Sequence, residues 1–80
     1  MQEQILDALR RNAPQDAVAL ATQWVQESPG QAAQGYRLLA LAQQYLGQLE
    51  QAHASLEQSL ALDPEDAASH LQHAGLLVAL

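Results

Sequence analysis

The sequence predicts an all-α fold of antiparallel helix hairpins, with about five helices, and its composition and an internal repeat support this prediction. The chain has 16 Ala, 15 Leu and 13 Gln, so residues that favour helices fill 44 of the 80 positions. Only five residues are β-branched, and Phe and Cys are absent, which leaves little material for strands and none for disulfides. Eighty residues are enough for one small domain or a short repeat array.

The first two helices are indicated by residues that start and stop helices. An apolar stripe runs through residues 2–11, and Asn12 can adopt the left-handed conformation that ends a helix. Pro14 suits the first turn of a second helix, which we expect to reach Glu27.

The third helix is expected to start near Ser28, because Ser28 and Gln31 have the spacing of a capping box. It should reach Leu46, and Gly47 should end it. A change of direction between the second and third helices follows from the Ser-Pro-Gly sequence before Gln31.

A fourth helix is predicted from the helical spacing of Leu49, Ala52, Leu56 and Leu60, and it should stop at Asp63-Pro64. A fifth helix should start near Asp66 and continue to Leu80. Acidic residues around its start lie where the positive end of the helix dipole favours them.

The pattern of helix stops repeats along the chain. A shift of 35 residues places Asn12 on Gly47 and Pro29 on Pro64. Such a period is typical of stacked helical repeats. We therefore interpret the chain as one domain with two hairpins and the first helix of a third, over residues 1–29, 30–64 and 65–80.

The middle unit resembles the tetratricopeptide repeat, an antiparallel helix pair of about 34 residues. The matching positions within residues 33–66 are Tyr36, Leu39-Ala40, Gly47, Ala52, Leu56 and Asp63-Pro64. Looser matches extend over most of the chain. One departure is Trp24, which stands where the family has a small Ala at a tight helix contact.

The resemblance implies a short right-handed superhelix whose first helices line a concave groove that binds a peptide or partner protein. The groove positions would be Leu6, Leu9, Arg10, Gln34, Arg37, Leu38, Leu41, Gln44, Tyr45, Gln72, His73 and Leu76. Leucines beside two arginines would suit an apolar peptide bearing a carboxylate. The alternative is that Leu38, Leu41 and Tyr45 are core residues, and that Arg10 or Arg37 pairs with a surface acid.

Two groups of residues could in principle bind a metal ion. They are Asp66, His70 and His73 on the fifth helix, and Glu50, His53 and Glu57 on the fourth. Three ligands from one exposed helix lack supporting groups, and surface charge pairs explain the second group. We therefore expect no metal and no cofactor. No serine has an evident base partner, so we expect no enzymatic activity.

Charge and hydropathy limit the remaining functions. Nine acidic residues and three arginines give a net charge of −6, which argues against nucleic-acid binding. The longest apolar run, residues 74–80, is far shorter than the roughly 20 residues that span a bilayer. With no evident secretory signal, we expect a cytoplasmic protein–protein interaction module. The alternatives are a structural element of a larger protein, or homodimerisation through residues 66–80.

Overall fold

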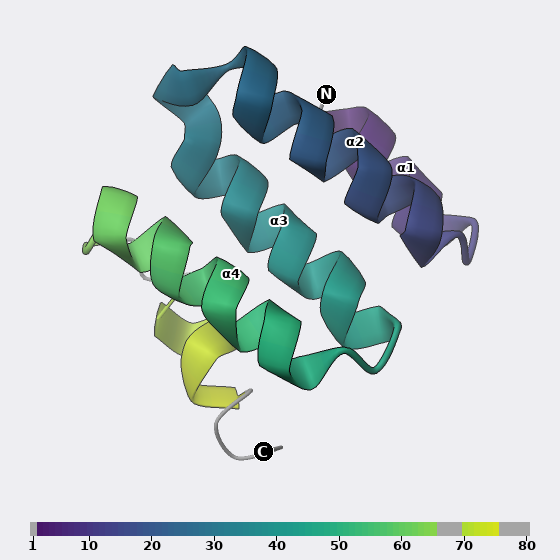
Figure 1. Cartoon of the computed structure of the whole chain (residues 1–80). Helices are drawn as coiled ribbons and strands as arrows, with labels where there is room; N and C mark the ends of the chain where they lie inside the picture. Colours follow the sequence, from purple (N-terminus) through teal and green to yellow (C-terminus); the bar gives the residue numbers. More distant parts are fainter. Residues whose placement is uncertain (1, 66–69, 76–80) are drawn as a thin grey trace.

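The computed structural model describes residues 2–65 and 70–75, and within these ranges all regular structure is helical, as predicted. Consecutive helices run antiparallel and lie side by side (Figure 1). Residues 70–75 are also helical and lie beyond α4. The elements are α1 (Gln2–Arg10), α2 (Pro14–Glu27), a short 3₁₀ helix η1 (Pro29–Gln31), α3 (Ala32–Tyr45) and α4 (Leu49–Leu62).

The two predicted helix stops have the same left-handed backbone. Asn12 has a φ of 61° and Gly47 a φ of 78°. The amide of each residue donates to the carbonyl three residues earlier, at 3.1 Å in both cases. Because L-residues other than Gly and Asn adopt this conformation at a cost, both hairpins turn at the residue type that the turn requires.

The start of α3 differs from the prediction. Pro14 occupies the first turn of α2 as expected, but the capping box between Ser28 and Gln31 is wrong, because Ser28 makes no side-chain cap hydrogen bond. The Gln31 carboxamide oxygen accepts a hydrogen bond from Trp24 Nε1, at 2.9 Å. A buried indole needs an acceptor for its N–H group. Gln31 supplies that acceptor, and α3 begins only at Ala32.

The larger core cluster joins α1, α2 and α3. Trp24 is its largest side chain and is only 5 % exposed. The cluster also contains alanines from all three helices, whose small side chains leave room for larger neighbours. The buried members are Ile5, Ala8, Ala17, Ala21, Trp24, Leu38 and Ala42.

The contact between α3 and α4 combines a small apolar cluster with hydrogen bonds. Ala40, Ala52 and Leu56 are fully buried there. Ser55 Oγ donates to the Gln43 side-chain oxygen and Ser59 Oγ donates to the Ala33 carbonyl oxygen, each at 2.7 Å.

The helical segment 70–75 contacts the second hairpin. Gln72 Nε2 donates to the Arg37 carbonyl oxygen on α3, at 3.3 Å, and His73 contacts His53 on α4. The rest of the predicted fifth helix lies outside the described residues. No helix in the described part of the chain is long and apolar enough to cross a membrane.

Candidate functional site

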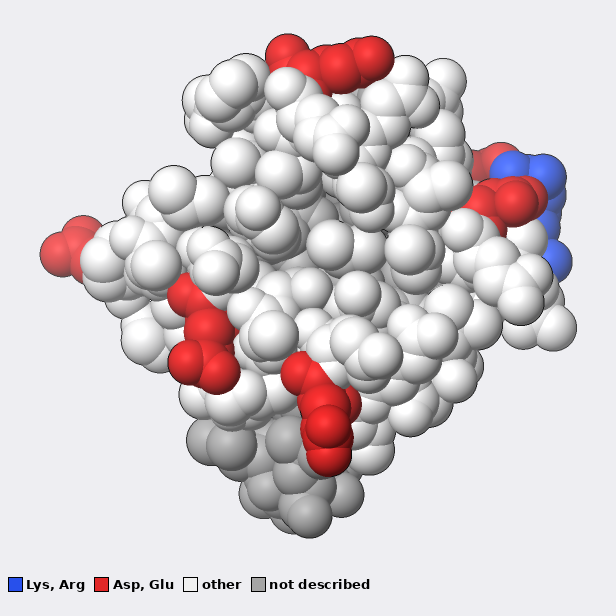
Figure 2. Space-filling view, viewed as in Figure 1, with Lys and Arg blue, Asp and Glu red and all other residues white. Residues whose placement is uncertain are grey.

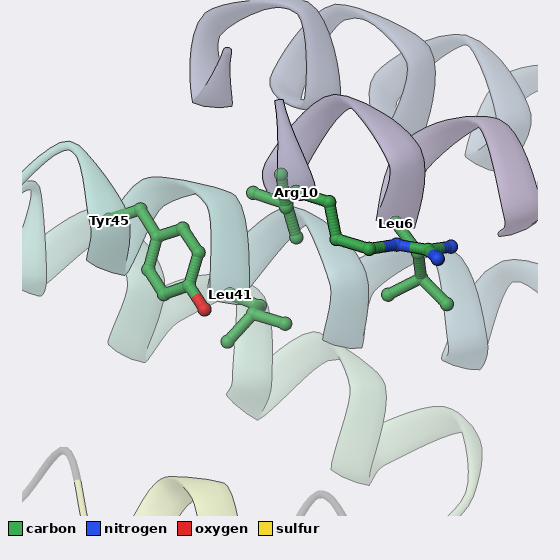
Figure 3. A pocket seen from close by; sticks show the side chains of 5 residues that line it. Leu6, Arg10, Leu41 and Tyr45 are labelled. Atoms are coloured by element: carbon green, nitrogen blue, oxygen red, sulfur yellow. The ribbon is translucent and has the colours of Figure 1, made fainter. Parts of the chain in front are cut away.

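An open pocket of about 260 Å³ lies between α1 and α3 (Figure 3). Leu6, Leu9 and Arg10 line it from α1, and Leu41 and Tyr45 line it from α3. The spacing of these residues explains how they meet. Residues three and four apart share one face of a helix, so each helix presents its residues to the pocket as a single short stripe.

The pocket has an apolar wall and a polar rim. Leu6, Leu9 and Leu41 are half-buried, and their side chains offer apolar surface without being enclosed. Tyr45 is 61 % exposed, and Arg10 is exposed on the α1 side, where its side chain extends beside Leu6 (Figure 3). The arrangement can bury an apolar group while a cation stands at its edge.

Arg10 differs from its neighbour in its electrostatic environment. Arg11 forms an ion pair with Asp7, with 3.0 Å between Arg11 Nε and an Asp7 carboxylate oxygen. Within residues 2–65 and 70–75, no carboxylate forms an ion pair with Arg10. Its guanidinium can therefore form a charge-assisted hydrogen bond with a ligand carboxylate.

The basic and acidic side chains are unevenly distributed over the surface. On the face shown in Figure 2, basic side chains are gathered at one edge, near the turn between α1 and α2. Acidic side chains adjoin them at that edge and also occur at separate places over the rest of that face. The basic charge on this face is therefore confined to that edge, where neighbouring acidic side chains partly offset it.

All five pocket residues are among the twelve groove positions inferred from the sequence. Leu38 is not in the pocket, because it is 3 % exposed and belongs to the larger core cluster. It lies four residues before Ala42, on the face of α3 that packs in that cluster. Leu41 and Tyr45 lie on the adjacent face, and neither is buried in the core.

The other predicted groove positions do not line this pocket. Gln34 is exposed and Gln44 is half-buried. Arg37, Gln72 and His73 are half-buried where residues 70–75 meet α3 and α4. Leu76 lies outside the described residues.

Glu50, His53 and Glu57 do not form a three-ligand cluster, and the other predicted grouping includes Asp66, which lies outside the described residues. In the described part of the chain, no group of three or more His, Asp or Glu side chains could hold a metal ion together. The structure instead brings together one histidine from each grouping, His53 and His73, a contact that sequence spacing along single helices does not reveal.

Comparisons of the chain with protein-family models, with curated protein sequences and with solved structures return no match.

Proposed function

We propose that this chain is a non-catalytic protein–protein interaction module of the tetratricopeptide kind, acting in the cytoplasm as a short right-handed superhelix. Its pocket between α1 and α3 binds an apolar side chain of a peptide, and Arg10 pairs with a carboxylate of the same peptide. The observation that carries the proposal is the combination of three leucines and a tyrosine with an arginine that no described carboxylate neutralises.

The size of the pocket supports a peptide over a free small molecule. At about 260 Å³, it is smaller than the roughly 300–1,000 Å³ of typical small-molecule sites. It fits one large side chain, and the open edges leave the rest of a peptide to continue across α1 and α3. Tyr45 supplies aromatic area at the rim, and aromatic residues are enriched at protein interfaces.

A peptide selection tests the proposal. We would display a random peptide library without Asp and Glu, so that the free C-terminus is the only carboxylate of each peptide. Peptides that bind the immobilised full chain would then be selected. We expect enrichment of large apolar residues near the C-terminus. The proposal is contradicted if selection enriches no peptide, or only peptides that bind equally well after amidation of the C-terminus.

A matched pair of substitutions locates the binding surface. Tyr45 and Leu62 are similarly exposed, at 61 % and 55 %, but only Tyr45 lines the pocket. Tyr45→Ala should weaken binding of a selected peptide about 10-fold, as for an interface aromatic worth over 1 kcal/mol. Leu62→Ala should change it less than two-fold. Equal losses in the two variants would place the site elsewhere.

Homodimerisation through residues 66–80 is the second candidate, and one observation favours it. Leu71, in the helical segment 70–75, is 77 % exposed, and exposed apolar side chains on a helix can mark an association surface. Under this alternative, Leu71→Ser should lower the mass measured by light scattering, whereas Tyr45→Ala should not.

A further inference from the structure

Two histidines that are far apart in the sequence point the same ring nitrogen at each other. His53 lies on α4, and His73 lies in the helical segment 70–75. Their Nε2 atoms are 3.0 Å apart, and their ring centroids are 4.6 Å apart with an interplanar angle of 35°. The rings are therefore tilted relative to each other instead of being stacked in parallel planes.

A carboxylate fixes the orientation of one of these rings. The Nδ1 atom of His53 is 2.8 Å from a carboxylate oxygen of Glu57, one turn further along α4. Nδ1 must donate in this contact, because a carboxylate is an acceptor. In the neutral ring, Nε2 of His53 then has no hydrogen and turns its lone pair toward His73.

We infer that His53 and His73 form a binding site for a divalent first-row transition-metal ion. Two imidazole nitrogens bound to one tetrahedral Zn²⁺ at about 2.0–2.1 Å lie about 3.3 Å apart. The two Nε2 atoms are therefore within about 0.3 Å of the spacing that the ion requires, a change that small rotations of the side chains provide.

Glu57 completes an arrangement that is common at metal sites. Metal-bound histidines usually donate their other N–H group to a carboxylate or carbonyl, which fixes the tautomer and makes the imidazole a better ligand. His53 already makes this contact. The ion would take the place of the hydrogen that the two Nε2 atoms share, and the neutral His73 would carry its proton on Nδ1 instead.

The chemistry of the pair selects the kind of ion. Imidazole suits Zn²⁺, Ni²⁺ and Cu²⁺, whereas Ca²⁺ and Mg²⁺ require several oxygen ligands. The His53 side chain is 27 % exposed, so water can reach the site and complete the coordination. The ion would link α4 to the segment 70–75 and hold that segment against the second hairpin.

Zinc titration of the untagged full chain tests the inference. We expect saturable binding of one Zn²⁺ per chain by calorimetry, a rise in melting temperature with Zn²⁺ concentration, and no such rise with Mg²⁺. In NMR spectra, the imidazole signals of His53 and His73 should shift and those of His70 should not. His70 is a suitable internal reference, because its Nε2 contacts the Pro64 carbonyl oxygen instead.

Two matched pairs of variants assign the ligands. His73→Ala should weaken Zn²⁺ binding at least 10-fold, and His70→Ala, in the same helical segment, less than two-fold. Glu57→Ala should weaken it about 10-fold, as loss of a supporting carboxylate does. Glu50→Ala removes the same charge from α4 and should have little effect, because the ion pair of His53 is with Glu57.

Three results would overturn the inference: no Zn²⁺ binding at millimolar concentration, equal effects of His73→Ala and His70→Ala, or a zinc-induced shift of the His70 signals alone. A pair that is only hydrogen-bonded gives a distinct result. In that case His73→Ala lowers the melting temperature by the same amount with and without Zn²⁺. Circular dichroism of each variant establishes that it retains its helices before binding is compared.

Discussion

The two sides of α3 are packed in different ways, although the sequence pattern predicts equivalent repeats on both. Toward α1 and α2, α3 contributes Leu38 and Ala42 to a cluster around Trp24. Toward α4, it meets a smaller apolar cluster and two serine hydroxyls. The difference is clearest at one repeat position, because a shift of 35 residues places Trp24 on Ser59.

The comparison shows that two positions 35 residues apart are stabilised by different means. Trp24 and Ser59 are both buried, and both form a hydrogen bond that ties their helix to a residue at or near the start of α3. The indole adds a large apolar area, whereas the serine adds only its hydroxyl. We therefore expect the first interface to depend on apolar burial and the second on close packing and hydrogen bonding.

The largest expected effect comes from removing the indole. Trp24→Ala should lower the free energy of unfolding by about 3–5 kcal/mol, because it removes the largest side chain of the larger cluster and leaves a cavity. Urea denaturation followed by circular dichroism measures the loss. Trp24→Phe keeps most of the apolar area and should cost less. The difference between the two interfaces would be contradicted if Trp24→Ala lowered the free energy of unfolding no more than Ser59→Ala does.

Gly35 tests how closely α2 approaches α3. A Cβ atom at Gly35 would lie 2.6 Å from Val25 Cγ2 on α2. Gly35→Ala should therefore lower the free energy of unfolding by about 1–2 kcal/mol, since the overpacking cost exceeds the gain in helix propensity. Chemical denaturation measures this change.

Two further variants control the Gly35 experiment. Adding Val25→Ala removes the clashing methyl group, so the double variant should be more stable than the sum of the single changes predicts. Gly30→Ala introduces a methyl group with no atom within 4 Å and should be nearly neutral. Additive effects of Gly35→Ala and Val25→Ala would show that the two helices do not meet there.

Ser59→Ala probes the hydrogen-bonded side of α3 and should cost about 1 kcal/mol, the net value of one hydrogen bond. Its hydroxyl donates to the Ala33 carbonyl oxygen at 2.7 Å, and alanine leaves the packing nearly unchanged. Thermal and urea unfolding both report the loss. A cost of 3 kcal/mol or more would mean that this hydroxyl stabilises the second interface as strongly as apolar burial stabilises the first.

The smallest effect is expected for Gly47→Asn, in the turn equivalent to that at Asn12. Gly47→Asn should change the free energy of unfolding by only a few tenths of a kcal/mol, because Asn12 already adopts the same left-handed conformation. Gly47→Ala should cost about 1 kcal/mol, since alanine is strained at positive φ. If the two substitutions have equal effects, the turns are not equivalent.

The sequence predicted those features of the fold that depend on local chemistry. Asn12, Gly47 and Pro14 act through the backbone conformations that each residue type favours, and these preferences operate before any packing. The start of α3 was mispredicted because the side chain of Gln31 had two possible partners. A buried indole seven residues earlier is the partner that it binds, and sequence spacing alone does not reveal that competition.

The residues of the candidate site are also only partly predictable from the sequence. The resemblance to the tetratricopeptide repeat predicts that Leu41 and Tyr45 share a groove with residues of α1, and they line one pocket with Leu6, Leu9 and Arg10. The same resemblance predicts that Leu38 faces the groove, but Leu38 is in the core. Positions on the two faces of α3 differ by only a few tens of degrees around the helix axis, and the sequence does not fix that angle. The meeting of His53 and His73 depends on where residues 70–75 pack, which no pattern within a single helix specifies.

We propose that the pocket between α1 and α3 binds a carboxylate-bearing apolar peptide through Arg10. Substitutions of the neighbouring Arg10 and Arg11 test this binding most directly. We would measure by calorimetry the affinity of a selected peptide, with its C-terminus free or amidated, for Arg10→Gln and Arg11→Gln. Arg10→Gln should weaken binding of the free-carboxylate peptide about five-fold, as expected for an exposed ion pair, and should abolish the difference between the two peptides. Arg11→Gln, which loses only the ion pair with Asp7, should preserve both affinities within two-fold. Equal effects of the two substitutions, or no effect of amidation on the unsubstituted chain, would contradict the claim.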